Sequence, residues 1–150
     1  MKLVATLDNK NHPYVTGYLL CSQYKGFKHA RFYLDTGCTC TTILDVDAVK
    51  LGLDWSCLTK SIHPSMTASG GVNPFELPNV IIGLQTFDDQ GKRTLKQFPL
   101  RVLHIIPPDD PTAIVPVQYS FSYSLLGIDV LKRFNHWYWD YKKKKVILER

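Results

Sequence analysis

The sequence predicts an all-β domain with few and short helices. Short runs of alternating or β-branched residues are separated by clusters of Gly, Pro, Asn and Asp, which is typical of strands joined by turns. The chain has 150 residues, of which 45% are hydrophobic, and this suits a domain with one core. We find no repeat, linker or low-complexity segment, so we expect residues 1–150 to form a single domain.

The N-terminal part predicts three strands. Residues 2–7 and 14–21 alternate in polarity, and Asp8-Asn9-Lys10-Asn11 lies between them, which indicates a β-hairpin. A third strand over residues 27–34 returns after this hairpin. It would deliver Asp35 at its end.

A short β-rich run over residues 41–44 precedes the clearest helix signal. Asp45 is a candidate helix cap, residues 46–51 would form the helix, and Gly52 would stop it. The segment 66–75 follows, with the glycine-rich composition of an exposed hairpin tip.

The C-terminal half predicts strands over 77–84 and 95–106, joined by a polar turn, and an extended run over 112–118. Alternating aromatic residues at 119–123 either line a groove or pack on a strand face. The chain closes with an aromatic strand, Trp137 to Tyr141, and an apolar one, Val146 to Leu148.

The net charge of +5 and the run Lys142-Lys143-Lys144-Lys145 raise the question of a nucleic-acid partner. The run lies between two expected strands, where a solvated turn collects lysines, so we expect no specific nucleic-acid partner. A nucleic-acid-associated β protein, with Trp137-Tyr138-Trp139 stacking on bases, stays as an alternative. The basic turn could also favour acidic substrates.

No membrane segment is expected from the sequence. The N-terminus meets Asp8 before an apolar region of signal-peptide length develops. No stretch approaches the roughly 20 consecutive apolar residues that cross a bilayer. We therefore expect a cytoplasmic protein without a membrane partner.

The cysteines indicate neither a disulfide framework nor a metal centre. Cys21, Cys38, Cys40 and Cys57 lack the two close pairs that zinc sites usually show, and the histidines are scattered. We expect reduced thiols, no metal and no cofactor.

The stretch that can carry chemistry is Asp35-Thr36-Gly37, directly after the apolar run Phe32-Tyr33-Leu34. Alone, it also fits an ordinary corner between a strand and a turn. Downstream, however, Leu125-Leu126-Gly127 leads into the segment 128–134, and a terminal strand follows. In this order, the motifs resemble those of the retropepsin-like aspartic proteases, the single-lobe relatives of pepsin.

The resemblance implies a closed retropepsin-like (acid protease) barrel, one lobe per chain, with a short helix over residues 128–134. By the same resemblance, the strand Leu125-Leu126-Gly127 would pass behind the Asp35 loop, with Gly127 allowing a close approach of backbone to backbone. It also implies a homodimer, because the sequence has no second Asp-Thr-Gly or Asp-Ser-Gly. Asp35 from each subunit would then activate water for peptide hydrolysis. Thr36 would hydrogen-bond across the two-fold axis, and Gly37 would let its N–H approach the carboxylate.

The same resemblance makes Ser69, Gly70, Gly71 and Val72 the substrate-binding flap. The substrate would be an extended peptide or protein segment, bound by main-chain hydrogen bonds beneath the closed flaps.

Cys38 stands where the family usually has a small or hydroxylated residue. A thiol is a weak hydrogen-bond donor, so a second interpretation is a catalytically silent dimer that binds peptides. We also hypothesise that oxidation of Cys38 lowers activity.

Overall fold

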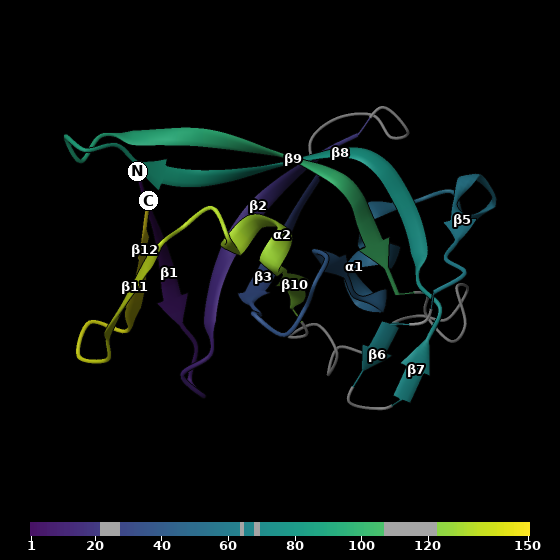
Figure 1. Cartoon of the computed structure of the whole chain (residues 1–150), viewed down its shortest axis with the longest axis horizontal. Coiled ribbons are helices and arrows are strands. Elements are labelled where there is room, and N and C mark those ends of the chain that lie inside the picture. The colour runs from purple at the N-terminus through teal and green to yellow at the C-terminus, as the bar shows by residue number, and fades with distance from the viewer. Residues whose placement is uncertain (22–27, 64, 68–69, 107–122) are drawn as a thin grey trace.

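The computed structural model describes residues 1–21, 28–63, 65–67, 70–106 and 123–150. It confirms a mostly β chain with short helices (Figure 1). The strands are β1 Lys2–Leu7, β2 Pro13–Leu20, β3 Lys28–Leu34, β4 Thr42–Ile43, β5 Thr59–Lys60, β6 Ser65–Thr67, β7 Gly70–Val72, β8 Phe75–Phe87, β9 Arg93–Ile105, β10 Ser124–Leu126, β11 His136–Asp140 and β12 Lys145–Glu149. The helices are α1 Asp45–Leu51 and α2 Ile128–Leu131, with a 3₁₀ turn η1 at Trp55–Cys57.

Ten strands form one sheet in the order β11-β12-β1-β2-β3-β10-β4-β9-β8-β5. Strand β8 also pairs with β1 and β2, so the sheet curls back on itself. The long β8–β9 hairpin bends over the rest of the sheet, and the two chain ends lie close together (Figure 1). The separate pair β6–β7 stands apart from this sheet.

Most expected elements are confirmed within a few residues, including the N-terminal hairpin, the β8–β9 pair and the terminal hairpin β11–β12. Lys142 to Lys144 of the lysine run lie in the exposed turn before β12, and Lys145 begins that strand. Helix α2 is shorter than the expected segment 128–134. The run 112–118 and aromatic residues 119–122 lie outside the described residues.

The expected cap of the first helix is wrong, although its end is confirmed. The helix begins at Asp45 itself, Leu44 takes the cap position, and no side chain caps it. Instead, the Leu44 N–H donates to the Ser124 hydroxyl at 3.2 Å, because β10 runs beside this segment. Gly52 ends the helix in the left-handed conformation, with φ 61°.

The core lies inside the curled sheet and contains the alternate residues of the long strands. Leu19, Ile82, Leu84 and Phe32 are fully buried in it. A Cβ at Gly17 would lie 2.9 Å from the Phe32 ring, so the absence of a side chain there makes room for this ring.

Strand β10 positions the site because it inserts between β3 and β4. It runs parallel to β3, with Leu126 opposite Leu34, and antiparallel to β4. Its first residue, Ser124, is buried and donates to the Asp47 carboxylate of α1 at 2.7 Å. Segments from both ends of the chain therefore meet beside Asp35.

No helix in the described part of the chain is long and apolar enough to cross a membrane.

Candidate active site

Asp35 directly follows β3 and is half-buried. Its backbone N–H donates to the Leu126 carbonyl at 3.0 Å, which continues the pairing between β3 and β10 by one residue. The position of this carboxylate is thus set by a strand from the far end of the chain.

The turn after Asp35 folds back onto its carboxylate. The Gly37 N–H donates to Asp35 Oδ1 at 2.8 Å, an approach that the family resemblance implied, and the Cys38 N–H donates to the Asp35 carbonyl at 3.3 Å. A Cβ at Gly37 would lie 3.2 Å from Oδ1, so a larger residue would crowd the carboxylate. Thr36 is exposed, and no described residue hydrogen-bonds to its hydroxyl.

Further hydrogen bonds join the loop after Asp35 to the residues at the start of α2. Ile128 N–H donates to the Cys38 carbonyl at 2.8 Å, and Gly127 N–H donates to Thr41 Oγ1 at 3.2 Å. The Asp129 carboxylate in turn accepts from Thr41, from its N–H at 2.9 Å and its hydroxyl at 2.7 Å. Helix α2 is therefore bonded to the loop through side chain and backbone.

Sequence reasoning missed Thr41 and Asp129. Asp129 is a lone acid in the apolar run of α2, and Thr41 follows Gly37 by four residues in a loop rich in Thr and Cys. That placement was the available signal, but it does not reveal that residues 88 positions apart bind each other.

No described hydrogen bond joins the Cys38 thiol to the Asp35 carboxylate. The thiol donates to the Cys40 carbonyl at 2.8 Å and lies 3.5 Å from the Thr42 hydroxyl. Burial raises the pKa of the Cys38 thiol, the hydrogen bond with Thr42 partly offsets this, and the nearby Asp35 charge adds to the rise.

We expect Cys38 to react more slowly with iodoacetamide in the folded protein than in urea. The thiolate is the reactive form, and a raised pKa lowers its population at mildly alkaline pH. Mass spectrometry of the peptide that contains Cys38, over a time course in both conditions, measures the two rates. Equal rates would contradict a partly buried thiol with a raised pKa. The same protection would slow the oxidation hypothesised above.

The expected flap coincides with the β6–β7 hairpin only in part. Gly70, Gly71 and Val72 form β7, which pairs with β6, whereas Ser69 lies outside the described residues. No backbone hydrogen bond of the described residues joins this hairpin to the Asp35 turn. Its action as a flap stays a prediction.

A tyrosine cluster lies on the strand that leads to Asp35. The Tyr33 ring packs 4.4 Å from Tyr123 between centroids, and Tyr123 packs 5.0 Å from Tyr14. The Tyr33 hydroxyl donates to Asp8 Oδ2 at 2.8 Å. Of the aromatic residues expected at 119–123, Tyr123 is thus described, and it packs on other rings.

Burial acts to raise the pKa of the Asp8 carboxyl, but hydrogen bonds from the His12 N–H, the Tyr33 hydroxyl and the Lys10 N–H outweigh it and leave this pKa below its ordinary value of 3.8. A carboxyl with a lowered pKa stabilises the fold above its unfolded pKa, and this contribution is lost as the pH falls through the lower folded value.

We therefore expect Asp8→Asn to lower the free energy of unfolding at neutral pH and to matter progressively less below pH 3.8. Urea unfolding of both proteins over a pH series measures the difference. A difference that stays constant down to strongly acidic pH would show that the ionised form of Asp8 is not what stabilises this loop.

Among the described residues, no group of three or more His, Cys, Asp or Glu side chains is arranged to hold a metal ion. Cys21, Cys38 and Cys40 are free thiols.

Comparison with known proteins supports the fold. The sequence matches no protein-family model and no curated protein. Among solved structures, the chain is similar to a retropepsin-like aspartic protease from Rickettsia conorii, with 21% identity and a TM-score of 0.58 over 99% of this chain and 89% of that chain. At this identity, the likeness shows that the chain has a retropepsin-like fold.

Proposed function

We propose that the protein is an aspartic endopeptidase that is active as a homodimer. The observation that carries this proposal is the Asp35 turn. Its carboxylate accepts the Gly37 N–H at 2.8 Å, and the turn is anchored to β10 and α2. The retropepsin-like fold supports the same conclusion.

Hydrolysis of a peptide bond without a metal or a covalent nucleophile needs a base for water and an acid for the carbonyl oxygen. Two carboxylates within hydrogen-bond distance supply both, because their mutual repulsion keeps one proton shared between them. One carboxylate takes a proton from water while the other protonates the carbonyl, and the roles then exchange.

The sequence has one Asp-Thr-Gly, so the second carboxylate would come from a second copy of the chain. In a two-fold dimer, the same turn of both subunits meets at the axis. The exposed Thr36 hydroxyl is then free to bond across that axis, and each Gly37 N–H keeps its own carboxylate in place.

The terminal strands offer a surface for this dimer. Strand β11 pairs with β12 along one edge, and no described strand pairs with its other edge. Tyr138 and Trp139 of β11, and Tyr141 directly after it, are each at least 43% exposed. Tyr and Trp are enriched at protein interfaces, and an unpaired edge can accept another strand.

The substrate would be an extended peptide segment that lies across the two Asp35 turns. Main-chain hydrogen bonds would bind it, and the segment Ser69, Gly70, Gly71 and Val72 of each subunit would close over it. Closure excludes bulk water and strengthens the electrostatics of the carboxylate pair.

Incubation of the purified chain with a mixed peptide library tests this proposal, with cleavage read by mass spectrometry from acidic to alkaline pH. We expect cleavage whose rate falls at alkaline pH, as the carboxylate pair loses its shared proton. A rate that still rises above neutrality would indicate another mechanism. No cleavage by a folded dimer would favour a peptide-binding module.

One observation favours the binding module as a second candidate. Cys38 donates to the Cys40 carbonyl, and no described bond joins its thiol to the Asp35 carboxylate. If the wild-type dimer is inert, Cys38→Ser tests whether a hydroxyl at this position restores cleavage. Cleavage by this variant would show that the thiol had silenced the site.

A further inference from the structure

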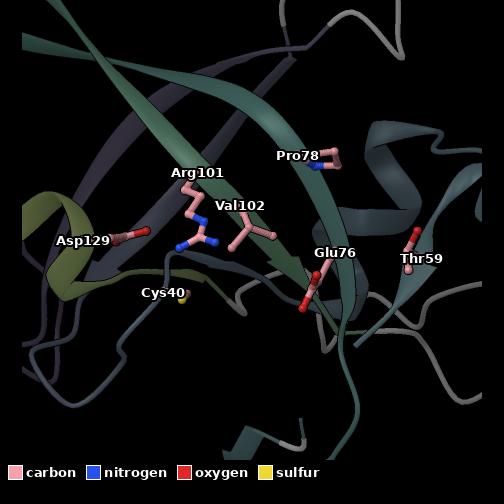
Figure 2. A pocket seen from close by; sticks show the side chains of 7 residues that line it. All are labelled: Cys40, Thr59, Glu76, Pro78, Arg101, Val102 and Asp129. Carbon is pink, nitrogen blue, oxygen red and sulfur yellow. The ribbon is translucent and has the colours of Figure 1, made fainter. Parts of the chain in front are cut away.

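A pocket of about 510 Å³ opens beside the loop that follows Asp35. Figure 2 shows its lining residues, which include Cys40 of that loop, Arg101 of β9 and Asp129 of α2. Glu76 of β8 lies on the side of the pocket opposite Asp129 (Figure 2). The pocket therefore joins the active-site loop to the bent β8–β9 hairpin.

The alternation of buried and exposed residues in β8 and β9 is interrupted near Arg101. Leu77 and Val80 are both buried, as are Leu100 and Leu103, although a regular strand buries alternate residues. The interruption lies at Asn79 of β8 and Arg101 of β9, which are not paired with each other. The residues on either side are paired, Pro78 with Val102 and Val80 with Leu100.

Asn79 has φ 57°, a left-handed conformation that is uncommon for a residue other than glycine. The buried positions of β8 and β9 change parity at this point, so the side chains on its two sides face the core from different positions of the alternation. Here the Arg101 side chain points from β9 toward Cys40 (Figure 2).

The Arg101 guanidinium is available to a ligand. Within the described part of the chain, it forms neither a hydrogen bond nor an ion pair, and neither Asp129 nor Glu76 is its partner. The Asp129 oxygens already accept from Thr41 and from the Val130 N–H. Among the described residues that line the pocket, Arg101 is also the one that is cationic.

The distance to Asp35 places the pocket within reach of a bound peptide. Cys40 is five residues after Asp35, so at most about 18 Å of chain separates their Cα atoms. An extended peptide advances about 3.3 Å per residue. A substrate side chain up to roughly five residues from the cleaved bond therefore spans the distance from Asp35 to Cys40, which lines the pocket.

We propose that Arg101 determines specificity by binding the carboxylate of an acidic substrate side chain a few residues from the cleaved bond. The proposal rests on the endopeptidase function above. A guanidinium presents paired donors that match a carboxylate. Glu76 and Asp129 also line the pocket and oppose an acidic ligand by repulsion, and this limits the preference.

Matched peptides that differ only as Glu against Gln, at each of the five positions on both sides of one cleavage site, test this proposal. We expect the wild type to cleave the acidic peptide roughly 3- to 10-fold faster in kcat/KM at one of these positions. Arg101→Gln should bring the ratio to about one, and added salt should reduce it in the wild type. Arg101→Glu should favour Lys there.

Arg93→Gln is the matched control, because Arg93 is exposed on the same strand and does not line the pocket. It should leave both the rate and the ratio unchanged. A wild type without an acidic preference, or a preference that survives in Arg101→Gln, would overturn the proposal.

A wild type that cleaves none of the peptides would contradict the endopeptidase function instead. Fluorescence anisotropy then measures binding of the same labelled peptides to wild type and to Arg101→Gln. Tighter binding of the acidic peptide by wild type alone would support the role of Arg101, and equal binding by both proteins would overturn it.

Discussion

Asp35→Asn should reduce peptide cleavage by roughly 10³-fold or more, because general acid and base catalysis are lost together. The amide keeps the shape of the carboxylate, and its oxygen can still accept the Gly37 N–H that lies 2.8 Å from Oδ1. It can neither take a proton from water nor share one with a partner carboxylate. Steady-state kinetics with one cleaved peptide measures the loss.

The fold and the dimer should survive this change. Sedimentation and thermal unfolding of Asp35→Asn should match those of the wild type. Asp89→Asn is the control, since Asp89 is an exposed carboxylate that pairs with the N-terminus, away from the site. Cleavage by Asp35→Asn at the rate of this control would remove Asp35 from the mechanism.

Gly127→Ala should have the largest effect on stability. A Cβ at this position would lie 2.7 Å from the Cys40 carbonyl carbon and 2.8 Å from both the Cys38 oxygen and the Thr41 nitrogen. All three are backbone atoms of the loop after Asp35, so the loop must move. We expect a loss of about 3 kcal/mol in the free energy of unfolding, and a melting temperature lower by about 6–12 °C.

Gly83→Ala is the matched control, because a Cβ there would meet only the Leu95 side chain, at 3.4 Å, in ordinary contact. Urea unfolding of both variants compares the two costs. If both variants lost the same small free energy of unfolding, the packing of α2 against the loop after Asp35 would not depend on this close approach, and other contacts would stabilise the Asp35 turn.

The sequence predicted the parts of this fold that depend on neighbouring residues. The helix end at Gly52 and the delivery of Asp35 by β3 are examples. The close approach at Gly127 was also predicted, but through the family resemblance, and the contacts of a Cβ there confirm it.

Residues that act through distant contacts could not be predicted in the same way. Thr41 and Asp129 bind across 88 positions, and Ser124 reaches Asp47 across 77. Arg101 enters its pocket where two strands lose their regular pairing, and alternation in the sequence does not show that. The cap at Asp45 was wrong by one position, because Leu44, which is bonded to Ser124 of β10, takes the extended conformation of the cap residue and Asp45 is already helical.

Mixing of subunits tests most directly whether two copies of Asp35, one from each chain, form the active site. Increasing amounts of Asp35→Asn chain are added to a fixed amount of wild type, and cleavage is measured after the subunits have exchanged. With random pairing, a threefold excess leaves one wild-type chain in four paired with another, so activity should fall to about one quarter. Activity that stays constant while subunits exchange would show that each chain works alone, and would contradict the proposed site.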